Sequence, residues 1–159
     1  MNTSQQLPSR DDVFWFMNSR VTVRRASAAN PDGLSILEHV MPHGDSPPQH
    51  VHRSEDEVFH ILEGVMRLRV GDREITAGAG DTIVAPKNIP HTFRVESASG
   101  VRVLTIITGP GFEAMMRALS RPAGAETLPE RVVPTPEFIE ALTRTAARHG
   151  IDIVGPPIL

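Results

Sequence analysis

The 159-residue chain contains no cysteine and no tyrosine. Without cysteine, disulfides, thiol nucleophiles and cysteine-ligated zinc or iron–sulfur sites are excluded, and without tyrosine so is any chemistry that needs a phenol. No apolar run approaches the roughly 18 residues that cross a membrane, and Met1–Arg10 lacks the apolar segment of a secretory signal. We therefore expect a cytoplasmic protein that has no membrane partner.

Lysine is also scarce in this sequence. Sixteen basic residues stand against 19 acidic ones, which gives a net charge of -3, and Lys87 is the only lysine. No strongly basic face is implied, so we do not expect a nucleic-acid partner. The 40% of apolar and 22% of charged residues are typical of a folded globular chain.

Fourteen prolines and twelve glycines indicate many turns and favour an all-β fold. About eight short strands at even spacing predict a small antiparallel barrel or jelly roll, although strand texture alone equally allows a β-sandwich without a site. After Gly109 apolar residues recur at helical spacing, and Thr135-Pro136 predicts the start of a second helix. We divide the chain into a flexible lead-in (1–12), a barrel with its N-terminal strands (13–109) and a helical C-terminal extension packed on the barrel (110–159).

Five of the seven histidines lie from residue 39 to residue 60, and two of them, His50 and His52, are two positions apart. In an extended segment His50 and His52 point to one face. Glu57 begins the next strand after a four-residue connection, so a tight reversal brings its carboxylate back toward the two rings. His91 follows a rigid turn between two prolines and opens a strand whose antiparallel return places it inside the same barrel.

Imidazole and carboxylate together suit a divalent transition metal. We predict that His50, His52, Glu57 and His91 hold one such ion per chain, and Fe, Mn, Ni, Co, Cu and Zn all accept these ligands. A site of this kind keeps positions open for water or a substrate. Because a carboxylate can also accept a proton, Glu57 is the candidate catalytic base.

These residues carry a resemblance to a known family. The first motif reads Gly44, five residues, His50-Val51-His52, four residues, Glu57, six residues, Gly64; the second reads Gly80-Asp81, four residues, Pro86, then His91. Both resemble the two cupin motifs, with Asn88 where the family usually has glycine and Val95 where it often has asparagine. Asparagine tolerates the left-handed backbone conformation that glycine supplies, and the second departure removes no ligand.

The resemblance extends over nearly the whole chain after residue 12, to small single-domain bacterial cupins described as quercetin 2,3-dioxygenase-like. It implies the cupin double-stranded β-helix, a jelly-roll barrel, here with short C-terminal helices. It also implies a metal-dependent dioxygenase acting on a small enol, flavonol or aromatic-like substrate, with Glu57 in the role of the base. The cupin fold hosts many activities, so two alternatives stay open: a metal-dependent isomerase or hydrolase, and a non-catalytic cupin that binds a metal or small ligand.

Strand parity places three further side chains in the barrel interior near the metal: Phe59, Ile61 and Phe93. They predict an apolar substrate pocket, although ordinary barrel core would look the same. We expect His60 to point to the opposite face and His39, His43 and His149 to be structural or exposed. For Glu38, one register of its strand points it inward and the other points Leu37 and His39 inward, and the sequence favours neither.

Two apolar segments lie near the ends of the chain, Val13–Met17 and the proline-rich tail 151–159. They are more hydrophobic than free termini should be, and cyclic dimers are the commonest soluble oligomers. We therefore predict a homodimer. The alternative is that both segments fold back on their own barrel.

Overall fold

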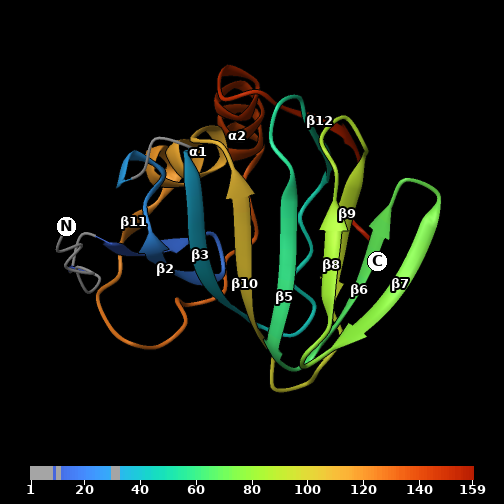
Figure 1. Cartoon of the computed structure of the whole chain (residues 1–159). Coiled ribbons are helices and arrows are strands. Elements are labelled where there is room, and N and C mark those ends of the chain that lie inside the picture. The colour runs from blue at the N-terminus through green and yellow to red at the C-terminus, as the bar shows by residue number, and fades with distance from the viewer. Residues whose placement is uncertain (1–8, 10–11, 30–32) are drawn as a thin grey trace, which may run out of the picture.

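The computed structural model describes residue 9, residues 12–29 and residues 33–159. Most of the expected flexible lead-in therefore lies outside the described residues. Within them, all paired strands run antiparallel and form two sheets. The mainly β jelly-roll architecture expected from the sequence is confirmed (Figure 1).

The larger sheet has seven strands and the smaller one five. The larger runs in the order β11 (Arg121–Pro122), β1 (Val13–Phe16), β2 (Ser19–Arg25), β3 (Leu34–Met41), β10 (Val101–Thr108), β5 (Glu57–Glu63), β8 (Thr82–Ala85). The smaller runs in the order β12 (Ile151–Gly155), β4 (Gln49–His52), β9 (His91–Val95), β6 (Val65–Val70), β7 (Arg73–Gly78). A short 3₁₀ turn, η2 (Ser27–Ala29), follows β2.

Period-two burial decides which side chains face inward. In β3 the buried residues are Ser35, Leu37, His39 and Met41. The register with Leu37 and His39 inside is therefore the observed one. Glu38 points the other way, where it forms ion pairs with Arg24 and Arg102.

Two buried clusters stabilise the molecule. One lies between the sheets and includes Phe59, Ile61 and Leu68. The other lies between the larger sheet and two helices, α1 (Gly111–Leu119) and α2 (Pro136–Arg148), and includes Leu37 and Met116. Figure 1 shows both helices gathered at one end of the sheets.

The helix boundaries follow local sequence signals. The Thr135 side chain accepts a hydrogen bond from the backbone N–H of Phe138, and Pro136 occupies the first turn of α2, as the sequence predicts. At the other end Gly150 has a φ of 81°, which glycine adopts without strain.

The C-terminal extension is not wholly helical, contrary to the division made from the sequence. Ile151–Gly155 forms β12 and pairs with β4, the strand that carries His50 and His52. Arg121–Pro122 adds a short strand beside β1. The extension thus contributes a strand to each sheet, and one of them borders the candidate site.

Both apolar segments near the chain ends fold back on their own barrel. Phe14 is 3% exposed within the helix-covered cluster, and the Trp15 indole N–H donates to the Thr127 carbonyl at 3.0 Å. Ile158 is 5% exposed, and its N–H donates to the Ser46 hydroxyl. These contacts remove the argument that the sequence offered for a homodimer, which stays an untested prediction.

Candidate metal centre

The structure brings together the four side chains that the sequence groups as metal ligands. His50 and His52 lie on β4, Glu57 opens β5 and His91 opens β9, where it pairs directly with His50. One potential ligand atom from each residue lies within 4.8 Å of the other three, and all four residues are buried. The close approach of three imidazoles and one carboxylate in the interior indicates a cation site.

The loops on either side of the ligands hold this arrangement. The backbone N–H of Asn88 donates to the His52 carbonyl at 2.7 Å, and that of Lys87 donates to the Asp56 carboxylate at 2.9 Å. Asn88 has a φ of 63°, so it adopts the left-handed conformation expected at this position. The turn before His91 is thereby tied to the connection between β4 and β5.

Each ring nitrogen Nδ1 of the three histidines faces an oxygen atom. His50 Nδ1 lies 2.8 Å from the Pro48 carbonyl, and His91 Nδ1 lies 3.0 Å from the Ile89 carbonyl. His52 Nδ1 lies 3.3 Å from a carboxylate oxygen of Glu55. Oxygen acceptors place the proton on Nδ1, and such contacts orient histidine ligands in metal sites.

The three Nε2 atoms consequently point toward Glu57. Glu57 Oε2 lies 2.9 Å from His91 Nε2, 3.5 Å from His52 Nε2 and 4.0 Å from His50 Nε2. His52 Nε2 is buried and has no hydrogen-bond partner. A buried polar atom without a partner is costly, and a cation at this point would satisfy it. The donor set therefore fits a divalent transition metal.

Burial and mutual contact shift the pKa values of these groups. Burial lowers the pKa of His50 to about 4, helped by the neighbouring His91. Burial alone would raise the pKa of Glu57, but the hydrogen bond from His91 and the nearby rings lower it to about 2. Burial would lower the pKa of His91, yet the hydrogen bond to Glu57 raises it above its ordinary value. Glu57 is thus ionised and His50 is neutral, as metal binding requires, whereas His91 holds its proton more tightly than an ordinary imidazole and would release it on binding a cation.

Glu55 is a supporting residue that the sequence analysis missed. It is 4% exposed, and its carboxylate accepts hydrogen bonds from the backbone N–H groups of Gly111 and Phe112 as well as contacting His52. A Cβ at Gly109 would lie 2.6 Å from Glu55 Oε1, so glycine is needed for this approach. The carboxylate thereby links the start of α1 to His52, a candidate ligand of the metal centre. Its negative charge is stabilising there, because the dipole of a helix favours negative charge at the N-terminal end. The sequence held one signal for this supporting role: Glu55 is an acidic residue three positions after the candidate ligand His52.

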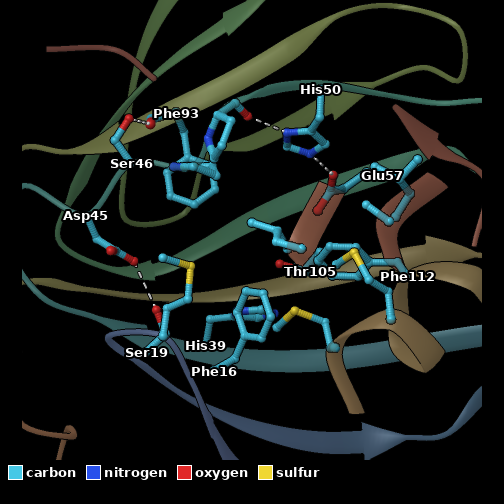
Figure 2. Close-up of a pocket in the computed structure, with 18 of the residues that line it drawn as sticks. Phe16, Ser19, His39, Asp45, Ser46, His50, Glu57, Phe93, Thr105 and Phe112 are labelled. Carbon is cyan, nitrogen blue, oxygen red and sulfur yellow. Dashed lines mark hydrogen bonds and ion pairs between the residues drawn. The ribbon is translucent and has the colours of Figure 1, made fainter. Parts of the chain in front are cut away.

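A cavity of about 110 Å³ reaches the metal centre. One water molecule needs roughly 10–15 Å³ of such cavity volume, so the cavity holds several waters or a small organic molecule. Phe59 lines it. Phe93, His50 and Glu57, which are labelled in Figure 2, line it as well. Ile61 is not among its lining residues: it is fully buried in the cluster between the sheets, because β5 carries it deeper into the barrel.

The remaining histidines have different surroundings. His60 faces away from the site and its Nδ1 lies 2.8 Å from the Thr82 hydroxyl, while His43 is exposed and His149 half-buried. His39 departs from expectation: it is 6% exposed and lines the cavity. Burial lowers its pKa to about 4.

Comparison with known proteins relates the fold and part of the sequence to a family. Residues 36–107 match the family model described as Cupin domain. A predicted oxalate decarboxylase of Thermotoga maritima has a similar fold, with a TM-score of 0.55 and 18% identity over 67% of this chain and 96% of that one. Residues 36–107 thus resemble the cupin domain in sequence, and the fold of the chain is similar to that of solved cupin-like structures.

Two curated relatives are similar in sequence. The quercetin 2,3-dioxygenase of Bacillus subtilis is 30% identical over 105 residues, which are 65% of this chain and 31% of that protein. An uncharacterised protein of Methanocaldococcus jannaschii is 30% identical over 67 residues, 42% of this chain and 52% of that one. The matches thus span about half or less of either relative. In the described part of the chain, no helix has the length and apolarity to cross a membrane, and the cytoplasmic location stays a prediction.

Proposed function

We propose that this protein is a metal-dependent cupin enzyme that binds one divalent transition metal through His50, His52, Glu57 and His91. The observation that carries the proposal is the orientation of the three imidazoles. Each Nδ1 faces an oxygen atom, so each Nε2 turns toward the same carboxylate oxygen. Fe, Mn, Ni, Co, Cu and Zn all suit this donor set.

We infer that the reaction is the dioxygenation of a small enol, flavonol or aromatic-like substrate. Support comes from the similarity to the Bacillus subtilis quercetin 2,3-dioxygenase and from the largely apolar wall of the cavity. A bound cation would supply Lewis-acid chemistry, which favours the anionic form of an enol or catechol oxygen. The Phe59 and Phe93 rings pack edge to face, with centroids 5.8 Å apart, and offer a surface for a flat ring.

Within this proposal Glu57 accepts the substrate proton. Its carboxylate is 2% exposed and lines the cavity, so it can reach a hydroxyl bound there while bulk water is excluded. The pKa of about 2 keeps it ionised but makes it a weak base. Proton transfer to Glu57 therefore depends on a substrate hydroxyl that is itself made acidic in the site.

The test joins metal analysis with an oxygen-uptake screen. Protein purified without added metal is analysed for transition metals, and each loaded form is then offered flavonols, catechols and smaller enols. The His52→Ala variant is the matched control. Metal-dependent oxygen uptake that disappears in this variant supports the proposal. Turnover without oxygen consumption would instead identify a metal-dependent isomerase or hydrolase, and metal binding with no turnover would identify a binding protein.

A further inference from the structure

His39 is the one residue of the cavity wall in the described chain whose imidazole has a buried nitrogen without a partner. It lies on β3, in the larger sheet, whereas His50, His52 and His91 lie in the smaller one, and Figure 2 labels it among the residues that line the cavity. Its side chain is buried, with the residue 6% exposed, and its Nε2 has no hydrogen-bond partner. The metal centre explains the comparable unpaired Nε2 of His52, but nothing in the fold explains that of His39.

The surroundings of His39 are mostly apolar. Phe112 stacks on it with ring centroids 6.4 Å apart, and the same Phe112 ring lies 5.5 Å from that of His52. The other polar pair at the cavity, Ser19 and Asp45, is joined by its own hydrogen bond of 3.0 Å. The unpaired Nε2 of His39 therefore belongs to a largely apolar wall, and the Phe112 ring packs against both His39 and His52.

A neutral imidazole can donate one hydrogen bond and accept another. Leaving such a group buried and unpaired is unfavourable, whereas a ligand that pairs with it gains selectivity over an analogue that lacks the matching group. Binding pockets commonly use a few polar groups in an apolar wall to fix the orientation of a ligand.

We propose that His39 binds the ligand through a hydrogen bond and so sets its specificity. The ligand class is a small, largely apolar molecule with two oxygen functions: an enol or catechol group at the metal centre and a hydroxyl or carbonyl group at His39. This inference rests on the proposed function of the metal centre. It adds a second anchoring point on β3, which carries none of the four metal ligands.

The experiment compares matched probes on the zinc-loaded protein, since zinc is diamagnetic. 3-Methylcatechol and 4-methylcatechol carry a methyl group where 2,3- and 3,4-dihydroxybenzyl alcohol carry a hydroxymethyl group. Calorimetry gives the dissociation constants for the wild type, His39→Leu and His39→Gln. In His39→Leu we expect the better alcohol to bind about 5- to 100-fold more weakly, with the methylcatechols changed much less. His39→Gln, which keeps a donor and an acceptor, should recover part of the loss.

A direct readout separates binding from structure. In ¹⁵N-histidine-labelled protein the better alcohol should shift the His39 ring nitrogen resonances, and the methylcatechols should shift them much less. Equal weakening of both probe types in His39→Leu, unchanged alcohol binding, or no binding of any probe to the wild type would overturn the proposal.

Zinc content is measured before the titrations, so that the proposed metal function is tested separately from the proposed role of His39. A wild type that takes up none of Fe, Mn, Ni, Co, Cu and Zn would refute the proposed metal function. The same probes would then be titrated by NMR against the metal-free protein, where selective alcohol binding with a His39 shift supports the His39 site and its absence overturns it.

Discussion

Strands β4 and β3 both place a buried histidine at the wall of one cavity, yet the two rings are held differently. On β4 the Nδ1 of His50 faces a backbone carbonyl and its Nε2 turns toward Glu57. On β3 His39 has a buried Nε2 with no partner. The candidate ligand thus differs from His39 not in its burial but in the oxygen atom behind its ring and the carboxylate in front of it, which are contacts that orient histidine ligands in metal sites.

Removing a ligand on β4 should give the largest effect. We expect His52→Ala to lose the metal, from about one ion per chain to nearly none. The barrel should stay folded, because its two buried clusters do not depend on the ion. Metal analysis and circular dichroism measure the two outcomes.

His60→Ala is the matched control, since this ring contacts Thr82 rather than the site. Full metal occupancy in His52→Ala would show that the ligand assignment is wrong.

Changing the carboxylate in front of the rings should have the next largest effect. Glu57→Gln keeps the shape and one coordinating oxygen but is not an effective base. If Glu57 moves a proton, turnover per bound metal should fall by about 10²–10⁴-fold, the usual contribution of general base catalysis. The measurement is turnover divided by metal content, on a substrate identified in the oxygen-uptake screen.

Glu57→Asp, which retains a carboxylate, should keep more of the turnover per metal than Glu57→Gln. Near-normal turnover per metal in Glu57→Gln would leave Glu57 as a ligand only.

Altering the oxygen behind a ligand should have a smaller effect. Glu55→Gln weakens the acceptor for His52 Nδ1 and for the first N–H groups of α1. Loss of such supporting contacts typically costs about 10–100-fold in metal affinity, so we expect a decrease in that range. Competition with a chelator measures it. Glu63→Gln, at an exposed carboxylate that pairs with Arg102, is the control and should bind metal normally. Equal metal affinities of Glu55→Gln and Glu63→Gln would show that Glu55 does not support the metal site.

The sequence predicts the metal-binding side of this comparison better than the opposite side. Period-two burial and motif spacing place His50, His52, Glu57 and His91 together, because those signals are local to short strands and turns. The inward position of His39 depends on how β3 pairs with β2 and β10. The pattern of apolar and polar residues within the strand does not determine this pairing. The same limit left the direction of Glu38 open.

The C-terminal segment shows a second limit of local signals. Ile151–Gly155 is short and follows a helix, and its strand conformation comes from pairing with β4. Two of its residues, Ile151 and Ile153, line the cavity. Glu55 was missed for a related reason: its partners at Gly111 and Phe112 are more than fifty residues away. Contacts of this kind are set by tertiary packing rather than by spacing.

The smallest effect concerns the stability of β3 in acid. Burial lowers the pKa of His39 from 6.5 to about 4, partly opposed by the charges of Glu57 and Glu38. Between these values the unfolded chain binds a proton that the folded chain does not, so the free energy of unfolding falls as the pH drops from about 6.5 to 4. His39→Leu removes this contribution. Since one pKa unit corresponds to about 1.4 kcal/mol, we expect the variant to be about 1–2 kcal/mol more stable at pH 5, relative to the wild type, than at pH 7.5.

Urea unfolding of chelator-treated wild type and variant at both pH values measures this difference of differences. The pKa of His50 is also lowered to about 4, but His50 is present in both proteins and its contribution cancels. Above pH 7.5 the difference in stability between the two proteins should be constant, because His39 is then neutral in both states. Parallel stability curves from pH 7.5 down to pH 5 would mean that His39 takes up a proton in the folded protein as readily as in the unfolded chain. The contrast between β3 and β4 would then rest on the absence of a hydrogen-bond partner alone.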